Sequence, residues 1–171
     1  EMVAGHSNGI RLSNHSYASV VGWHWNGSSW VNNNNSDKFG MYSTTTRQWD
    51  SIVGDTGLVV FKSAGNDRND GPSYSKDGPF DCIPPIGNAK NIITIGATSD
   101  SDEMSSFSSW GPTDDGRVKP DLCANGVGLI STLPSNSYGS YSGTSMSSPS
   151  ACGTSALLYQ LYQKELGEEP A

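Results

Sequence analysis

Two short, continuous apolar runs constrain the fold of this chain more than any other feature. They lie in residues 57–66, GLVVFKSAGN, and 91–98, NIITIGAT, and residues 41–54 before the first run carry apolar side chains at helical spacing. Strands that are apolar on both faces are typical of parallel sheets buried between helices. The sequence therefore predicts an α/β fold with a parallel sheet flanked by helices.

Other segments complete this outline. Residues 9–18 begin as a strand, residues 127–133 form another, and residues 135–143 are expected to form a hairpin or tight turn. A long helix is predicted from about Thr144 to Leu166, and its first half is almost entirely Ser, Ala, Gly and Cys. Such small side chains predict that another backbone packs very close to it. Residues 20–40, rich in Asn, Gly, Ser and Trp, are expected to be a surface insertion.

Charge and hydropathy limit the possible partners. The 171 residues carry a formal net charge of −7, which argues against nucleic acid, since its partners present a basic face. No stretch approaches the roughly 18 apolar residues of a membrane span. We therefore expect neither a nucleic-acid nor a membrane partner.

The three cysteines leave at least one thiol unpaired within the chain. A Cys82–Cys123 disulfide remains open, and Cys152, in the small-residue helix, is expected to be a buried thiol. His6, His15 and His24 recur every nine residues, but no carboxylate or cysteine accompanies them at ligand spacing. The sequence predicts no metal site.

The segment GTSMSSPSACG, residues 143–153, places Ser145 at the expected start of the long helix. A serine there can be a helix cap or a nucleophile. The segment resembles the serine motif of the subtilisin-like serine proteases. Two further segments match that family in the right order: RLSNHSYA, residues 11–18, and FKSAGN, residues 61–66. The resemblance implies the three-layer, subtilisin-like arrangement of a parallel sheet and helices.

The same resemblance assigns roles to individual residues. Ser145 would be the nucleophile, with its own backbone N–H as one oxyanion donor, and Asn66 would supply the second donor from its side chain. His15, by this alignment, is structural rather than catalytic. The substrate groove would be lined by Ser16, Tyr17 and Ala18 on one side and by Ser63, Ala64 and Gly65 on the other, with Thr144 beside the nucleophile. Family members usually carry glycine where Ala18 stands.

The family's triad runs Asp, His, Ser along the chain, and this sequence lacks both earlier motifs. No histidine precedes glycine, and Asp55, in GDTG, stands before an apolar run rather than at the end of a strand. Residues 1–171 therefore resemble a partial peptidase domain that holds the nucleophile and the oxyanion asparagine. We expect the isolated chain to be nearly inactive, and the missing N-terminal half of the domain to be its partner.

The remaining expectations also come from the resemblance. The substrate would be a protein or peptide, and the chemistry would need no cofactor. Calcium often stabilises this family, but no residues are assigned to it, and residues 66–71 are only a weak candidate. Secretion is expected by analogy. The alternative is a non-catalytic module, derived from the same family, that binds peptides without cleaving them.

Overall fold

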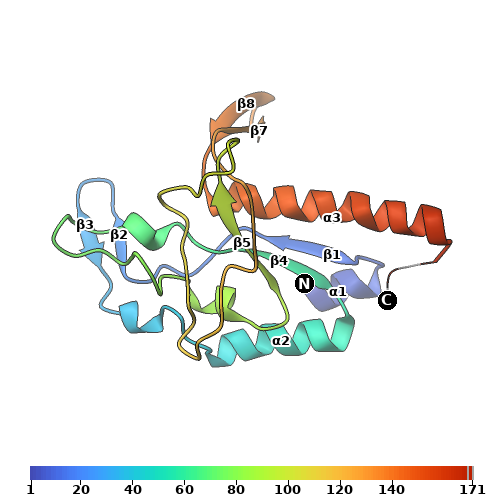
Figure 1. Ribbon diagram of the computed structural model, residues 1–171, viewed down its shortest axis with the longest axis horizontal. Helices are drawn as coiled ribbons and strands as arrows, with labels where there is room; N and C mark the ends of the chain where they lie inside the picture. Colours follow the sequence, from blue (N-terminus) through green and yellow to red (C-terminus); the bar gives the residue numbers. More distant parts are fainter. Residues whose placement is uncertain (169, 171) are drawn as a thin grey trace.

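The centre of the molecule is a parallel sheet of four strands (Figure 1). The computed structural model describes residues 1–168 and 170. In spatial order, the strands are β1 (Leu12–His15), β4 (Val59–Ser63), β5 (Ile93–Thr98) and β6 (Leu122–Asn125). All three pairings are parallel. The two apolar runs of the sequence are β4 and β5, the inner strands, which confirms the predicted sheet.

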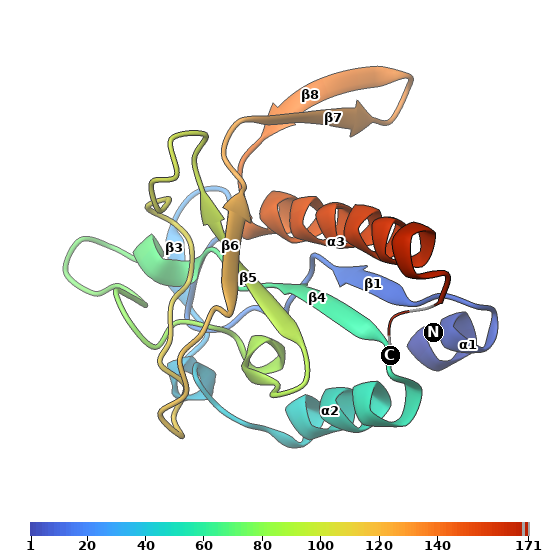
Figure 2. The same ribbon diagram turned by 45° about the vertical axis from the view of Figure 1, so that its right-hand side comes forward.

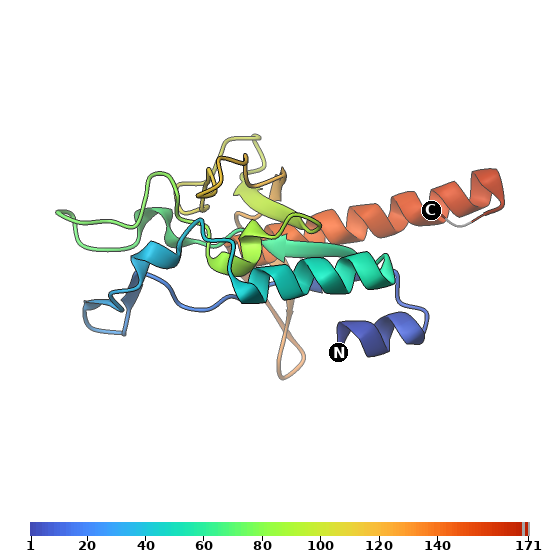
Figure 3. The same ribbon diagram turned by 90° about the horizontal axis from the view of Figure 1, so that it is seen from below.

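Helices cover the two faces of this sheet, so the fold has the expected three layers. Helix α2 (Thr44–Thr56) lies on one face and α3 (Thr144–Leu166) on the other (Figures 1 and 3). Helix α2 begins at Ser43, whose side chain forms a capping box with Thr46, and it ends at Gly57 in the left-handed conformation. Beneath α2 lies a core of Trp49, Leu58, Val60, Ala89 and Ile92.

Helix α3 packs through its small residues, as the sequence predicts. It contacts all four strands of the sheet, and Ser147 and Ser148 are fully buried. A Cβ placed on Gly126 would lie 2.8 Å from the Ala97 Cβ and 3.1 Å from the Ser147 Cβ. A larger residue at Gly126 would therefore push α3 away from the end of β5.

Several shorter elements lie outside the central layers. They are α1 (Met2–Ser7), the β2 (Trp23–Trp25) and β3 (Trp30–Asn32) hairpin, the β7 (Leu129–Leu133) and β8 (Ser137–Tyr141) hairpin, and the 3₁₀ turns Ser36–Lys38, Asp67–Asn69 and Pro85–Asn88. The β7–β8 hairpin projects from the body of the molecule (Figure 2). The expected strand at 127–133 is thus confirmed, but it pairs only with β8 among the described residues.

Some sequence expectations need correction. All three cysteines are free, so the possible Cys82–Cys123 disulfide is absent. Cys82 is buried against Trp110, whereas Cys123 is exposed on the edge strand β6. Cys152 is half-buried rather than buried. The insertion at 20–40 is mostly exposed, but Val21 and Phe39 form a small buried cluster with Cys82.

One flank of the molecule presents apolar side chains to solvent. Strand β1 pairs with β4 alone and is an edge of the described sheet. Along the second half of α3, Leu157, Leu158 and Leu161 are more than half exposed, with relative accessibilities of 68%, 60% and 51%. Apolar surface of this extent is typical of an interface. No helix within the described residues is long and apolar enough to cross a membrane.

Candidate active site

A cleft of about 280 Å³ lies where β1 and β4 end and α3 begins. Ligands of parallel α/β sheets commonly bind at this carboxyl end of the strands. Eight of the nine residues that the sequence assigns to catalysis or substrate binding line the cleft: Ser16, Tyr17, Ala18, Ser63, Gly65, Asn66, Thr144 and Ser145. The ninth, Ala64, is fully buried beneath it.

Ser145 is held by a reciprocal pair of hydrogen bonds to a residue 129 positions away. Its hydroxyl donates to the carbonyl oxygen of Ser16 at 3.2 Å, and the hydroxyl of Ser16 donates to the carbonyl oxygen of Ser145 at 2.9 Å. The Ser145 carbonyl is free for this because its normal helical donor would be residue 149, which is proline and has no N–H. Pro149 therefore leaves the Ser145 carbonyl free to accept a hydrogen bond from Ser16, the residue that follows β1.

A second network fixes the orientation of Asn66. Its Oδ1 accepts hydrogen bonds from the backbone N–H of Thr144 at 2.9 Å and from the Thr144 hydroxyl at 3.0 Å. The Thr144 Oγ1 in turn accepts from the backbone N–H of Gly65 at 3.1 Å. Within the described residues, no hydrogen bond engages the Asn66 Nδ2 or the backbone N–H of Ser145. Two unengaged donors thus belong to residues that line the cleft, Asn66 and Ser145.

The chain turns sharply between β4 and Asn66, and the turn needs glycine. Gly65 has φ +108°, a conformation that costs other residues backbone strain. An added Cβ would lie 2.5 Å from Asp67 Oδ2 and 2.9 Å from Ser109 Oγ. Gly65 is therefore required for Asn66 to reach the start of α3.

Within the described residues, no histidine forms a hydrogen bond with Ser145. The imidazole of His15 is buried, bonded to Ser13 and Tyr17, and packed edge-on against Trp49. Burial, followed by the charge of Lys62, lowers the pKa of His15. These contacts agree with a structural role for His15. His24 does line the cleft, but its Nδ1 is buried and finds no hydrogen-bond partner in the part of the chain that the structure describes.

Seven residues of the cleft were not expected from the sequence: Ser19, Val20, Trp23, His24, Asp67, Asp70 and Pro84. The most perturbed is Asp67, whose pKa burial raises to about 7, helped by the charges of Asp70 and Asp77 and opposed by a hydrogen bond from Ser109. Asp67 directly follows Asn66, but no sequence pattern reveals that its side chain is partly buried. Trp23 and His24 reach the cleft from the insertion at 20–40.

The weak calcium candidate at 66–71 gains no support from the arrangement of its side chains. Within the part of the chain that the structure describes, no three His, Cys, Asp or Glu side chains come together as metal ligands would. Asp67 and Asp70 both face the cleft.

Comparison with known proteins gives a consistent result. The family model described as "Subtilase family" matches residues 1–170. The chain is 33% identical over 142 residues to subtilisin amylosacchariticus of Bacillus subtilis subsp. amylosacchariticus, which covers 80% of the chain and 34% of that protein. It is 40% identical over 84 residues to a C5a peptidase of Streptococcus pyogenes serotype M3, which covers 46% of the chain and 7% of that protein.

A solved structure supports the fold. The prenylagaramide maturation protease PagA superposes with a TM-score of 0.70 at 20% identity, covering 99% of this chain and 50% of that one. The chain therefore spans about a third of the length of the subtilisin it matches and about half of this structural neighbour.

Proposed function

The chain belongs to the subtilase family, and from this premise we propose that it is the part of a serine endopeptidase domain that carries the nucleophile Ser145 and the oxyanion donor Asn66. The observation that carries the proposal is the cleft, because Ser145, Asn66 and the residues expected to hold substrate all line it.

The proposed reaction begins when the Ser145 Oγ attacks the carbonyl carbon of a peptide bond and gives its proton to a base. The carbonyl oxygen becomes negative in the tetrahedral intermediate. The Asn66 Nδ2 and the Ser145 N–H, both without a hydrogen-bond partner among the described residues, would donate to it. The C–N bond then breaks, the amine leaves with the proton, and water hydrolyses the acyl-enzyme.

The base and its orienting carboxylate are proposed to come from the rest of the domain. No histidine within the described residues hydrogen-bonds to Ser145, and the Ser145 hydroxyl donates instead to a backbone carbonyl. The free edge of β1 and the exposed leucines of α3 are the surface on which we expect the rest of the domain to pack. Burying those leucines would offset the cost of assembling the two parts.

The substrate is proposed to be a protein or peptide lying extended between residues 16–18 and 63–65, with backbone pairing to both segments. Ala64 would act there through its backbone, since its side chain is fully buried. We also propose that the protein is secreted, that the chemistry needs no cofactor, and that any stabilising calcium ion binds at residues not yet assigned.

The absence of a histidine bonded to Ser145 within the described residues also favours the second candidate, a peptide-binding module without catalysis. The deciding experiment is labelling with a serine-reactive fluorophosphonate. It uses this chain alone and the same chain together with the rest of its domain. We expect labelling only in the longer protein, lost in Ser145→Ala and kept in Ser140→Ala, an exposed serine on β8.

Two further outcomes sharpen the test. Labelling that survives in Ser145→Ala, or fails in a folded longer protein, would overturn the proposed nucleophile and favour the binding module. His24→Ala is the control for the base. Because His24 lines the cleft, unchanged labelling is expected if the base lies elsewhere in the domain.

A further inference from the structure

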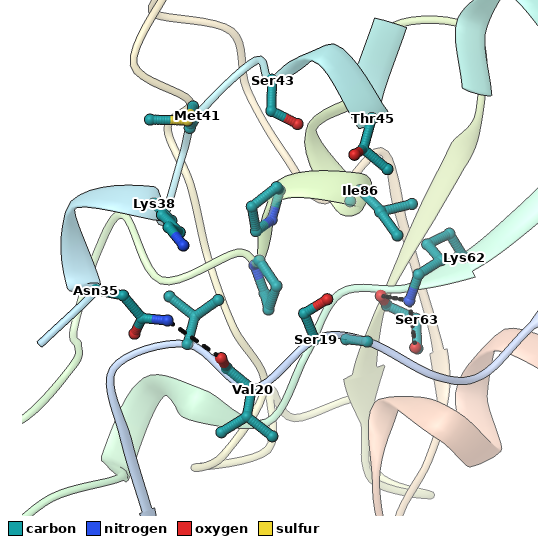
Figure 4. Close-up of a pocket in the computed structure, with 15 residues that line it drawn as sticks. Ser19, Val20, Asn35, Lys38, Met41, Ser43, Thr45, Lys62, Ser63 and Ile86 are labelled. Carbon is teal, nitrogen blue, oxygen red and sulfur yellow. Dashed lines mark hydrogen bonds between the residues drawn. The ribbon is translucent and has the colours of Figure 1, made fainter. Parts of the chain in front are cut away.

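A second cavity adjoins the cleft and shares part of its wall. It measures about 320 Å³ and shares Ala18, Ser19, Val20, Ser63 and Pro84 with the cleft as a common wall. Figure 4 shows the side chains that line it, which come from residues 18–21 after β1, the loop before α2, the start of α2, the end of β4 and residues 84–87. We call this cavity the lysine pocket.

The distinguishing group in the lysine pocket is Lys62, near the end of β4. Its side chain is only 1% exposed, although it ends in an ammonium group. The Nζ donates to the carbonyl oxygen of Ser63 at 3.1 Å and to the Ser63 hydroxyl at 3.0 Å (Figure 4). Within the described residues, no ion pair joins Lys62 to a carboxylate. A buried ammonium without a counter-charge is costly and rare in folded proteins.

The other groups around the lysine pocket are also suited to an anion. Lys38 adds a second positive charge, and no Asp or Glu is among the described residues that line the pocket. The start of α2 contributes Ser43 and Thr45, where the helix dipole places partial positive charge. The positive charge of the pocket is opposite in sign to that of the chain as a whole, which has 17 acidic and 10 basic residues.

The pKa of Lys62 agrees with a buried ammonium group that forms no ion pair with a carboxylate among the described residues. Burial lowers the pKa of Lys62 to about 8, and the charge of Asp67 acts in the opposite direction. An ammonium in this position would gain from an oxygen anion placed in the pocket, because charge-assisted hydrogen bonds are strong where water is excluded.

We propose that the lysine pocket binds a carboxylate group, with the Lys62 Nζ as its charged donor and Lys38 at the rim. The carboxylate has two possible sources, a free small carboxylate or an acidic side chain of a peptide lying in the neighbouring cleft. The shared wall of Ala18, Ser19 and Val20 places the pocket beside that peptide. Only the peptide source rests on the proposed function, since the pocket itself does not depend on the role of Ser145.

The experiment uses the chain with the rest of its domain, carrying Ser145→Ala so that no peptide is cleaved. The first arm titrates sodium acetate against sodium chloride at equal ionic strength and follows the Lys62 pKa by NMR of ¹³C-labelled lysine. The second arm measures peptide binding, with Glu or Gln at successive positions on the amino-terminal side of the bond facing residue 145. Lys62→Met is the main variant, and Lys76→Met, an exposed lysine outside the pocket, is its matched control.

A bound carboxylate is expected to raise the Lys62 pKa. Lys62→Met should weaken its binding by about 10- to 100-fold, the usual effect of losing a hydrogen bond to a charged group. Lys76→Met should leave binding unchanged. Acetate binding alone identifies a free carboxylate as the ligand, whereas a Glu-over-Gln preference that disappears in Lys62→Met identifies the peptide.

Other results would overturn the proposal. One is acetate and Glu peptides that bind no better than chloride and Gln peptides, and another is binding that persists unchanged in Lys62→Met. If Lys62→Met fails to fold, Lys38→Met at the rim takes its place, with a smaller expected loss. Peptides that do not bind at all would count against the proposed function, whereas peptides that bind equally well with Glu or Gln count against the peptide as the source of the carboxylate.

Discussion

The two halves of α3 lie in opposite surroundings. In the first half, Thr144, Ser147 and Ser148 are buried, and their hydroxyls are all hydrogen-bonded, to Asn66, Thr144 and Asn14 respectively. In the second half, Leu157, Leu158 and Leu161 face solvent. The first half of α3 supports the candidate site through buried side chains, whereas the second half leaves apolar side chains exposed. We call them the finished half and the open half. Ser145, the proposed nucleophile, is held in place by hydrogen bonds, whereas the second half of α3 exposes apolar side chains that an interface could bury.

The largest expected effect is a loss of turnover, caused by a substitution next to the finished half of α3. Asn66→Ala, in the chain joined to the rest of its domain, should lower turnover by about 10²–10³-fold, the size known for the oxyanion asparagine of subtilisin itself. The reason is that the Asn66 Nδ2, the proposed oxyanion donor, is lost while Ser145, the proposed nucleophile, stays. Steady-state kinetics on a fluorogenic peptide measure the change. Turnover that stays within a few-fold of wild type would show that Asn66 serves only to hold Thr144.

The next effect tests the open half. Leu161→Ser should reduce the free energy of unfolding by about 1–3 kcal/mol in the protein with the rest of its domain, because the leucine would then be buried. In the isolated chain, where Leu161 is 51% exposed, the change should be within about 0.5 kcal/mol. Urea denaturation of both forms gives the comparison. Ile130→Ser on the β7–β8 hairpin is the control. Equal effects in the two forms would mean that nothing covers this face of α3.

A pH-dependent effect concerns Asp67, a half-buried acid that follows Asn66 and lines the cleft. The pKa of Asp67 is raised to about 7, so the folded protein holds this proton more tightly than the unfolded chain does. The resulting stability is therefore fully present below about pH 4 and is lost as the pH rises through 7. Asp67→Asn should stabilise the protein by about 1–3 kcal/mol at pH 8 and hardly at all at pH 4.

Thermal unfolding across this pH range measures the effect. Asp55→Asn, on an exposed carboxylate of α2, is the control and should shift the unfolding temperature little at either pH. A stabilisation by Asp67→Asn that is the same at pH 4 and pH 8 would contradict the assignment to the Asp67 carboxyl.

The smallest effect concerns the link between β1 and the finished half. Ser16→Ala removes the hydrogen bond to the Ser145 carbonyl, which has no helical donor because of Pro149. The loss should cost about 1 kcal/mol of stability and reduce activity by about tenfold or less. Pro149→Ala in the same background should restore part of the stability, since the new N–H can bond to that carbonyl. If stability does not recover, the backbone N–H at residue 149 cannot replace the Ser16 hydroxyl as donor to the Ser145 carbonyl.

Much of this protein could be predicted from its sequence. Helix α3 has the expected bounds, and the apolar runs are the inner strands. The strand β6 was missed, because it is only four residues long, Leu122–Asn125, and directly follows a long polar region. Eight of nine expected site residues line one cleft. They belong to short motifs that follow neighbouring parallel strands, and the ends of such strands meet at the same edge of the sheet.

By itself, the sequence determined the parallel sheet, its helices and the residues that form the cleft, because hydrophobic patterning and local motifs act over short stretches of chain. Only the tertiary structure decided that Ser16 hydrogen-bonds to Ser145 across 129 residues, that the pKa of Asp67 is raised, and that Lys62 lacks a counter-ion among the described residues. These features depend on which distant groups exclude water from a side chain. The physical reason is that charge and hydrogen-bond energies are set by burial, which depends on contacts between residues far apart in the sequence and is not visible in local patterns.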